Sequence, residues 1–287
     1  MKKKLFSIFL ILCILVCGCS NNDTNVISKE VIIGESIPVE IESTSDEEQV
    51  MHFPAIDAYF EQYDEAGCIF INVKTNEKWI YNDNICSLRM SPLSTFKILN
   101  TLILLEEGAF EDKNSQIIWD GSVYPVNEWN CDQTLESAFK KSVVWVYQES
   151  ANKVNREVYE NYIENCNYGN KDVSGIEGTF WINSSLEISL IEQCSFLLKL
   201  YNEDLDFEPE NIKEVKQMML EQQTDQYSLY GKTGSDASEG IYLYVGYVEG
   251  IDGNSYVFAA YISDHDYYEE NQAKMQIKLI ADEIYAK

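Results

Sequence analysis

The chain has 287 residues, a formal net charge of −27, and 45% hydrophobic and 13% aromatic residues. This composition is typical of a folded protein, and the length is enough for one large or two small domains. The negative charge argues against nucleic acid as a partner, because phosphates would be repelled. Only two histidines (His52, His265) and two arginines (Arg89, Arg156) are present, which disfavours a Ser-His-Asp triad and a histidine-rich metal site.

The N-terminus predicts an export signal over residues 1–18. Three lysines precede the apolar run Leu5–Cys17, which is shorter than the roughly 20 residues that a membrane-spanning helix needs. The end of the run, Val16-Cys17-Gly18-Cys19, resembles the lipobox of bacterial lipoproteins. That resemblance implies a lipidated Cys19 anchored at the outer face of the bacterial cytoplasmic membrane. An ordinary secretory signal that is simply removed is the alternative.

Residues 19–50 are polar and acidic with little periodicity, which predicts a flexible tether and leaves 51–287 as the folded domain. Five cysteines besides Cys19 remain after the signal, namely Cys68, Cys86, Cys131, Cys166 and Cys194. Five is an odd number and the spacings match no zinc pattern. We expect mostly buried thiols, with the pairing left open.

Periodicity predicts secondary structure along the whole domain. We expect strands at 66–74 and 77–82, and then a helix from Ser94 to Glu107 ended by Gly108. Helical segments follow over 132–165, interrupted near Ser142, and a helix at 188–202 begins with a Ser189/Glu192 capping box. A helix from Pro209 to about Gln222 precedes strands within 228–236, 240–250 and 254–263, and a last helix is expected within 269–287. Strands at both ends predict an α+β fold, with one antiparallel sheet built from the two termini, flanking helices, and a helical insertion at about 110–205.

A serine and a lysine share one helical face at the start of the segment SPLSTFKILN. Ser94 and Lys97 are one turn apart, and a hydroxyl at a helix N-terminus lies near unsatisfied N–H groups. Lys97 could act as a general base only if it is neutral, which from a pKa of about 10.4 costs roughly 4.6 kcal/mol at pH 7. Burial among Phe96, Ile98 and Leu99 can supply a shift of that size. The pair is therefore a candidate nucleophile and base.

Ser-x-x-Lys spacing alone is weak, and its second occurrence, Ser137 to Lys140, is expected to be ordinary surface. Two further elements strengthen the first: Ser142, where two helical segments meet, and Lys232-Thr233-Gly234 on a predicted strand. Such a strand edge offers backbone N–H groups, its glycine admits a substrate closely, and its lysine and threonine can bind a carboxylate. These are the parts of penicillin-recognising serine enzymes.

Over roughly residues 52–287 the chain resembles the class D serine β-lactamases. The stretches that carry the resemblance are STFKILNTLILLEEG, WDG at 119–121, EWNCDQTLESAFKKSVVWVYQE, NYGN, GTFWINSSLEIS and YGKTGS. Tyr168-Gly169-Asn170 and Trp181 distinguish class D from class A. The resemblance implies the penicillin-binding/β-lactamase fold, an α/β/α sandwich, and hydrolysis of penicillin-type β-lactams.

The resemblance also implies roles for single residues. Ser94 would be acylated, and Lys97 would react with carbon dioxide to form a carbamate that serves as the general base, with no other cofactor and no metal. Trp181 would donate a hydrogen bond to that carbamate, and Phe96 and Val144 would keep the site dry.

Further roles concern the leaving nitrogen and the substrate carboxylate. Ser142 would pass a proton to the leaving nitrogen, and Lys232 would attract the substrate together with Thr233 and Gly234. The backbone N–H groups of Ser94 and Ser235 would form the oxyanion hole.

One departure concerns the arginine by which the family holds that carboxylate. No arginine follows Arg156. Lys274 lies in about the right region and is the expected replacement, although a lysine lacks the two-pronged geometry.

Three other functions remain open: a penicillin sensor that stays acylated, a cell-wall transpeptidase, and a non-catalytic lipoprotein. Sensors normally carry membrane-spanning helices, which the sequence does not predict, and Trp181 and the Tyr168 motif count against a transpeptidase.

Overall fold

The computed structural model describes residues 53–286 except 177, 267 and 269. The predicted signal, Cys19 and the tether lie outside the described residues. Within that described part, no helix has the length and apolarity needed to cross a bilayer.

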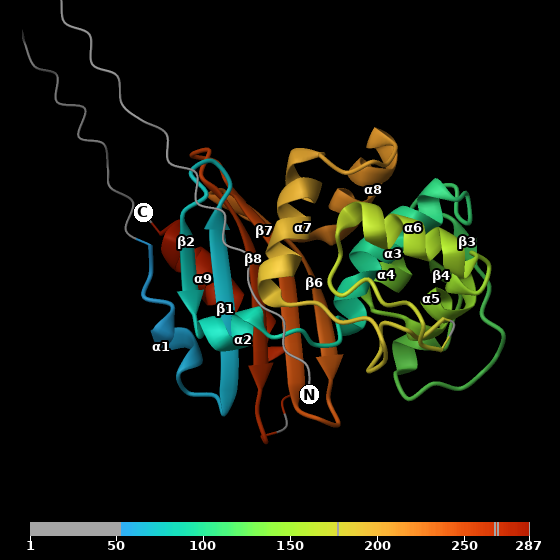
Figure 1. Ribbon diagram of the computed structural model, residues 1–287, viewed down its shortest axis with the longest axis horizontal. Helices are drawn as coiled ribbons and strands as arrows, with labels where there is room; N and C mark the ends of the chain where they lie inside the picture. Colours follow the sequence, from blue (N-terminus) through green and yellow to red (C-terminus); the bar gives the residue numbers. More distant parts are fainter. Residues whose placement is uncertain (1–52, 177, 267, 269, 287) are drawn as a thin grey trace, which may run out of the picture. The chain divides into compact units, whose positions relative to one another are not determined.

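A six-stranded antiparallel sheet, ordered β2-β1-β8-β7-β6-β5, forms the centre of the domain (Figure 1). Its strands are β1 (Glu65–Asn72), β2 (Lys78–Tyr81), β5 (Leu220–Gln223), β6 (Tyr227–Asp236), β7 (Ile241–Gly250) and β8 (Ser255–Ser263). The N-terminal strand β1 pairs along its whole length with the last strand, β8. The sheet is therefore built from both ends of the chain, as the sequence predicted.

Side chains of the sheet alternate between two cores, one on each face. Leu243, Val245 and Tyr247 of β7 face the larger core, which includes α7 (Leu190–Asn202), whereas Tyr242 and Tyr244 face α9 (Gln272–Ile284). The short helix α1 (Asp57–Phe60) joins the α9 side. The result is the layered α+β architecture expected from the sequence.

Most of the remaining helices lie to one side of the sheet, beyond β6 (Figure 1). They are η1 (Leu93–Phe96), α3 (Lys97–Glu106), η2 (Asn127–Trp129), α4 (Leu135–Lys140), α5 (Val144–Ala151), α6 (Arg156–Cys166) and α8 (Pro209–Met219), with the small hairpin β3 (Gln116–Ile117) and β4 (Gln133–Thr134); α2 (Asp83–Ser87) lies near β1. The expected insertion at 110–205 included α7, which in the structure packs on the sheet because its buried face meets β1, β7 and β8.

The boundary between α8 and β5 differs from the sequence expectation. The helix predicted to reach Gln222 ends at Met219, and the next residue, Leu220, already pairs with Tyr230. Pairing with β6 overrides the helical pattern there, because a distant strand offers the backbone a hydrogen-bonding partner. No loop separates α8 from β5.

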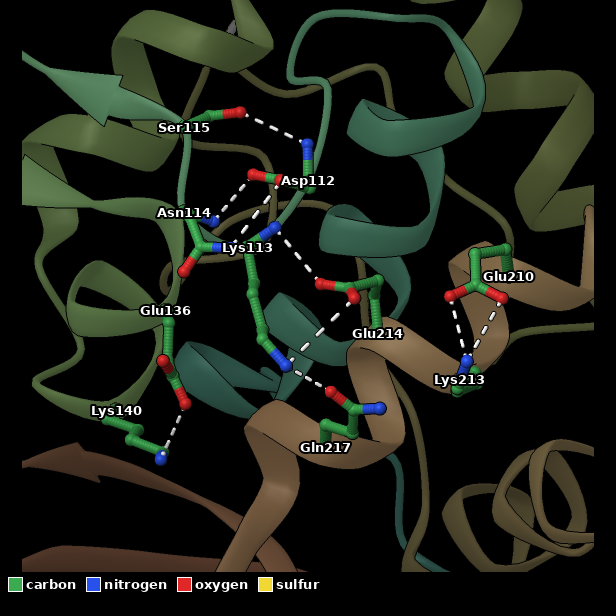
Figure 2. Close-up of polar contacts among 10 residues, drawn as sticks. All are labelled: Asp112, Lys113, Asn114, Ser115, Glu136, Lys140, Glu210, Lys213, Glu214 and Gln217. Carbon is green, nitrogen blue, oxygen red and sulfur yellow. Dashed lines mark hydrogen bonds and ion pairs between the residues drawn. The ribbon is translucent and has the colours of Figure 1, made fainter.

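Polar contacts fasten α8 to the segment that follows α3 (Figure 2). The backbone N–H of Lys113 donates to Glu214 Oε2 at 3.1 Å, and the Lys113 ammonium contacts Gln217. Glu136 N–H donates in turn to the carbonyl of Lys113 at 2.9 Å. We call these four residues the Lys113 latch.

Candidate active site

Ser94 lies in the 3-10 helix η1, here called the serine turn, which directly precedes α3. The preceding residue, Leu93, has a φ of +50°, an uncommon value for a bulky side chain. The Leu93 N–H donates to the carbonyl of Trp181 at 3.1 Å and its side chain is buried, so the surroundings hold this conformation. Backbone strain of this kind clusters at functional sites.

Lys97 is the first residue of α3 and its side chain is completely buried. Its Nζ donates to Ser94 Oγ at 2.8 Å. Burial, and secondarily the charge of Lys232, hold the pKa of Lys97 well below its usual value of 10.5. An uncharged amine in contact with a serine hydroxyl can accept that hydroxyl's proton.

Aromatic side chains pack around Phe96, the residue of η1 that lies between Ser94 and Lys97 in the sequence. Phe96 and Trp181 are fully buried with ring centroids 5.4 Å apart, and Phe96 also meets Tyr168 and Phe180 edge-on. These contacts bring Phe96, predicted to keep the site dry, against Trp181, predicted to donate a hydrogen bond to the carbamate. The Trp181 Nε1–H is buried and has no hydrogen-bond partner among the residues that the structure describes. An unpaired buried donor costs about 1–3 kcal/mol, so this position is suited to an acceptor.

Tyr147 of α5 supports Lys97 from the other side and was not identified from the sequence. The Lys97 Nζ lies 5.0 Å from the Tyr147 ring centroid. The Tyr147 hydroxyl is 2.8 Å from Thr101 Oγ1, which donates to the Lys97 carbonyl at 2.6 Å. Thr101 is four residues after Lys97, so helical spacing was the available signal, whereas the contact with Tyr147 depends on tertiary packing.

Ser142 lies between α4 and α5 with a φ of +54°. The Lys232 ammonium contacts Ser142 Oγ and donates to the Thr233 carbonyl at 2.9 Å. Lys232 is 2% exposed; burial lowers its pKa to about 7, while Glu221 raises it and Lys274 lowers it further. Lys232 therefore exchanges protons near neutral pH.

Strand β6 approaches η1 closely at the glycine of Lys232-Thr233-Gly234. A Cβ at Gly234 would lie 3.1 Å from Thr95 Cγ2 and 3.2 Å from the Pro92 carbonyl oxygen. Only a residue without a side chain lets the strand come this near the serine turn without displacing a neighbour. Thr233 is partly exposed and Ser235 exposed, so both face accessible space.

Two of the predicted site residues, Val144 and Lys274, are only partly buried. Val144 begins α5 and is half-buried. Lys274, in the first turn of α9, pairs with Glu221 of β5. The helical pattern of residues 209–222 did not predict a role for Glu221. The structure thus brings Ser94, Lys97, Ser142 and Lys232 together, and places Lys274 against a carboxylate of its own chain.

Comparisons with known proteins place this arrangement in a family. The family model "Penicillin binding protein transpeptidase domain" matches residues 60–286. The chain is 37% identical to the probable β-lactamase YbxI of Bacillus subtilis over 207 residues, covering 71% of this chain and 77% of that protein. It is also 33% identical to the regulatory protein BlaR1 of Bacillus licheniformis over 208 residues, 71% of this chain but 34% of BlaR1.

A solved class D β-lactamase from Bacillus subtilis superposes with a TM-score of 0.77 at 34% identity, covering 82% of this chain and 97% of that structure. The resemblance inferred from the sequence is thereby confirmed, together with the fold class. With its sheet, its serine turn and its Lys-Thr-Gly strand, the chain belongs to the class D β-lactamase family of penicillin-binding transpeptidase domains.

Proposed function

We propose that the protein is a serine β-lactamase that opens the ring of penicillin-type antibiotics through an acyl-enzyme on Ser94. The observation that carries this proposal is the 2.8 Å contact between Ser94 Oγ and the fully buried amine of Lys97. Ser94 Oγ forms a bond to the lactam carbonyl carbon while the carbon–nitrogen bond of the ring breaks. Water then cleaves the resulting ester and restores the serine.

Proton movements follow from the two serine–lysine pairs. Lys97, kept neutral by burial, accepts the proton of Ser94. Ser142 gives a proton to the leaving nitrogen and regains it from the Lys232 ammonium that contacts its hydroxyl. The backbone N–H groups of Ser94 and Ser235 stabilise the oxyanion, and loss of one such donor typically slows a reaction about 10²–10³-fold.

The surroundings of Lys97 fit a carbamate formed from carbon dioxide. Only an uncharged amine reacts with carbon dioxide. The buried Trp181 Nε1–H has no partner among the described residues and can donate a hydrogen bond to such an anion. When bound, the group supplies an anionic oxygen base. Phe96 and Trp181 exclude bulk water around it.

Lys232 and Thr233 bind the carboxylate of the β-lactam at the edge of β6. The Lys232 ammonium lies 2.9 Å from the Thr233 carbonyl and 3.4 Å from Thr233 Oγ1, so both side chains can bind the same carboxylate. This local cation offsets the long-range repulsion of an anionic substrate by a chain with a net charge of −27.

A penicillin sensor is the second candidate, and the similarity to BlaR1 is the observation that favours it. A sensor would be acylated once and would stay acylated. Mass spectrometry of the protein mixed with penicillin, followed over time beside hydrolysis of a chromogenic cephalosporin, separates the two functions. Sustained turnover with a transient adduct on Ser94 supports the hydrolase, whereas one stoichiometric burst supports the sensor. Absence of any adduct, or an unchanged adduct in Ser94→Ala, refutes both.

We further propose that the protein is exported and held at the outer face of the cytoplasmic membrane by acyl chains on Cys19. The lipobox-like Val16–Cys19 supports this location. Metabolic labelling with palmitate should mark the wild type but not Cys19→Ser, and label retained by that variant would refute the anchor.

A further inference from the structure

Asn271, the residue that caps α9, connects this helix to the Lys-Thr-Gly strand. Its Nδ2 donates to the Gly234 carbonyl at 3.2 Å and lies 2.9 Å from Ser235 Oγ. Its Oδ1 accepts the backbone N–H of Lys274 at 2.9 Å. Lys274 is therefore held one helical turn from the strand that binds the substrate.

Glu221 reaches Lys274 because of an irregularity in β5. The strand pairs Leu220 with Tyr230 and Gln222 with Leu229, so Glu221 is the extra residue of a β-bulge. Bulges turn a side chain out of the regular alternation and are frequent next to active sites. Here the bulge presents the Glu221 carboxylate to the Lys274 ammonium, and the two form a salt bridge.

The charges of this salt bridge act on Lys232 of the Lys-Thr-Gly strand. Both Glu221 and Lys274 contribute to the shifted pKa of Lys232, in opposite directions. Their side chains are 23% and 27% exposed, so a small anion can reach them from solvent. The Lys274 Nζ also lies 6.0 Å from the ring centroid of Tyr244, a buried residue of β7.

We propose that Glu221 is a specificity-determining residue: it holds Lys274 in the free enzyme and is displaced from it by the carboxylate of the incoming β-lactam. The proposal rests on the proposed function. One carboxylate replaces another on the same ammonium, so the partly exposed Lys274 keeps a charged partner. The displaced Glu221 carboxylate, which is partly exposed, is then hydrated by solvent.

This exchange has a consequence for selectivity. Glu221 competes with every anionic substrate and so raises its KM, whereas a substrate without a carboxylate does not need Lys274. Removing the charge of Glu221 should free Lys274 and lower KM for the acid. Removing Lys274 should raise KM for the acid, and neither change should affect an ester.

The test measures KM and kcat for a chromogenic cephalosporin and for its carboxylate methyl ester at a pH well below 7, where the Lys232 ammonium predominates in every variant. Glu221→Gln should lower KM for the acid about fivefold, which is what a partly exposed ion pair is worth. Lys274→Met should raise that KM about tenfold, the effect of one charge-assisted hydrogen bond. The ester should respond less than twofold to either change. Glu221→Thr, which also removes the charge, serves if the glutamine variant folds poorly.

Glu210→Gln is the matched control, because it removes one carboxylate from an exposed ion pair with Lys213 at the other end of α8 (Figure 2). It should leave both KM values unchanged. An unchanged KM in Lys274→Met, a raised KM in Glu221→Gln, or equal effects on acid and ester would overturn the role of Glu221 while the wild type still turns over. A wild type that is neither acylated nor active overturns the proposed function, and this inference with it.

Discussion

Replacing Trp181 by Phe should weaken the stabilisation of the protein by bicarbonate. The indole Nε1–H of Trp181 is buried without a partner in the part of the chain that the structure describes. A phenylalanine keeps an aromatic ring beside Phe96, whose centroid is 5.4 Å from that of Trp181, but removes the donor. The substitution therefore tests whether the donor serves an anion formed on Lys97.

The magnitude follows from the worth of a hydrogen bond to a charged group, about 1.5–3 kcal/mol. A loss of about 2 kcal/mol raises the dissociation constant for carbon dioxide roughly 30-fold. At a concentration 100 times the wild-type constant, binding stabilises the wild type by about 2.7 kcal/mol. The same concentration should stabilise the variant by only about 0.9 kcal/mol. At about 2–4 °C per kcal/mol for a domain of this size, the bicarbonate-dependent rise in Tm should shrink by about 4–7 °C.

The assay is thermal unfolding with and without bicarbonate at constant pH and ionic strength, beside ¹³C NMR of protein equilibrated with labelled bicarbonate. Loss of packing around the smaller ring is present in both conditions and cancels in the difference. Trp145→Phe is the control, because Trp145 is also buried but its Nε1–H donates to the Trp129 carbonyl at 3.0 Å. Lys97→Ala should show no bicarbonate effect and no carbamate signal.

An equal bicarbonate-dependent shift in wild type and Trp181→Phe would refute the assignment of this donor. A shift that persists in Lys97→Ala would show that carbon dioxide acts elsewhere, and would refute the carbamate itself.

Two other predictions concern the lysines. Lys97→Ala should lower the acylation rate about 10²–10⁴-fold, the usual contribution of a general base, or leave a long-lived acyl-enzyme. Mass spectrometry at intervals after mixing with penicillin measures both quantities. Normal turnover in this variant would exclude Lys97 from the mechanism. Because the pKa of Lys232 is lowered to about 7, its ammonium predominates below pH 7 and is lost above it, so KM for an anionic β-lactam should rise as pH increases through 7. Lys232→Arg should flatten that profile, and a profile that stays as steep would assign the titration to another group.

Local signals predicted the serine turn well. Ser94 and Lys97 are three residues apart in one helical segment, so their contact depends only on helical geometry and on the apolar residues that follow. The capping box of Ser189 and Glu192 formed as expected, and Gly108 takes the positive φ expected after the end of α3. Each of these features is decided within a few residues of chain.

Contacts between distant segments were not predictable in the same way. Ser142 and Lys232 meet across 90 residues of sequence, and only the resemblance to a family brought them together beforehand. The position of Glu221 could not be predicted because Met219 and the residues after it continue the helical pattern of α8. Pairing with β6 decides their actual conformation. That the Trp181 Nε1–H has no partner within residues 53–286, as far as these are described, depends on tertiary packing, which no spacing rule predicts.

Because α8 continues directly into β5, a movement of the helix also moves the backbone of Glu221. Glu221 lies two residues beyond the last residue of α8, and the Lys113 latch grips that helix through Glu214 and Gln217. A stiff helix carries a small displacement at one end to the other. Substitutions in the Lys113 latch should therefore change the position of Glu221 relative to Lys274 without altering either residue.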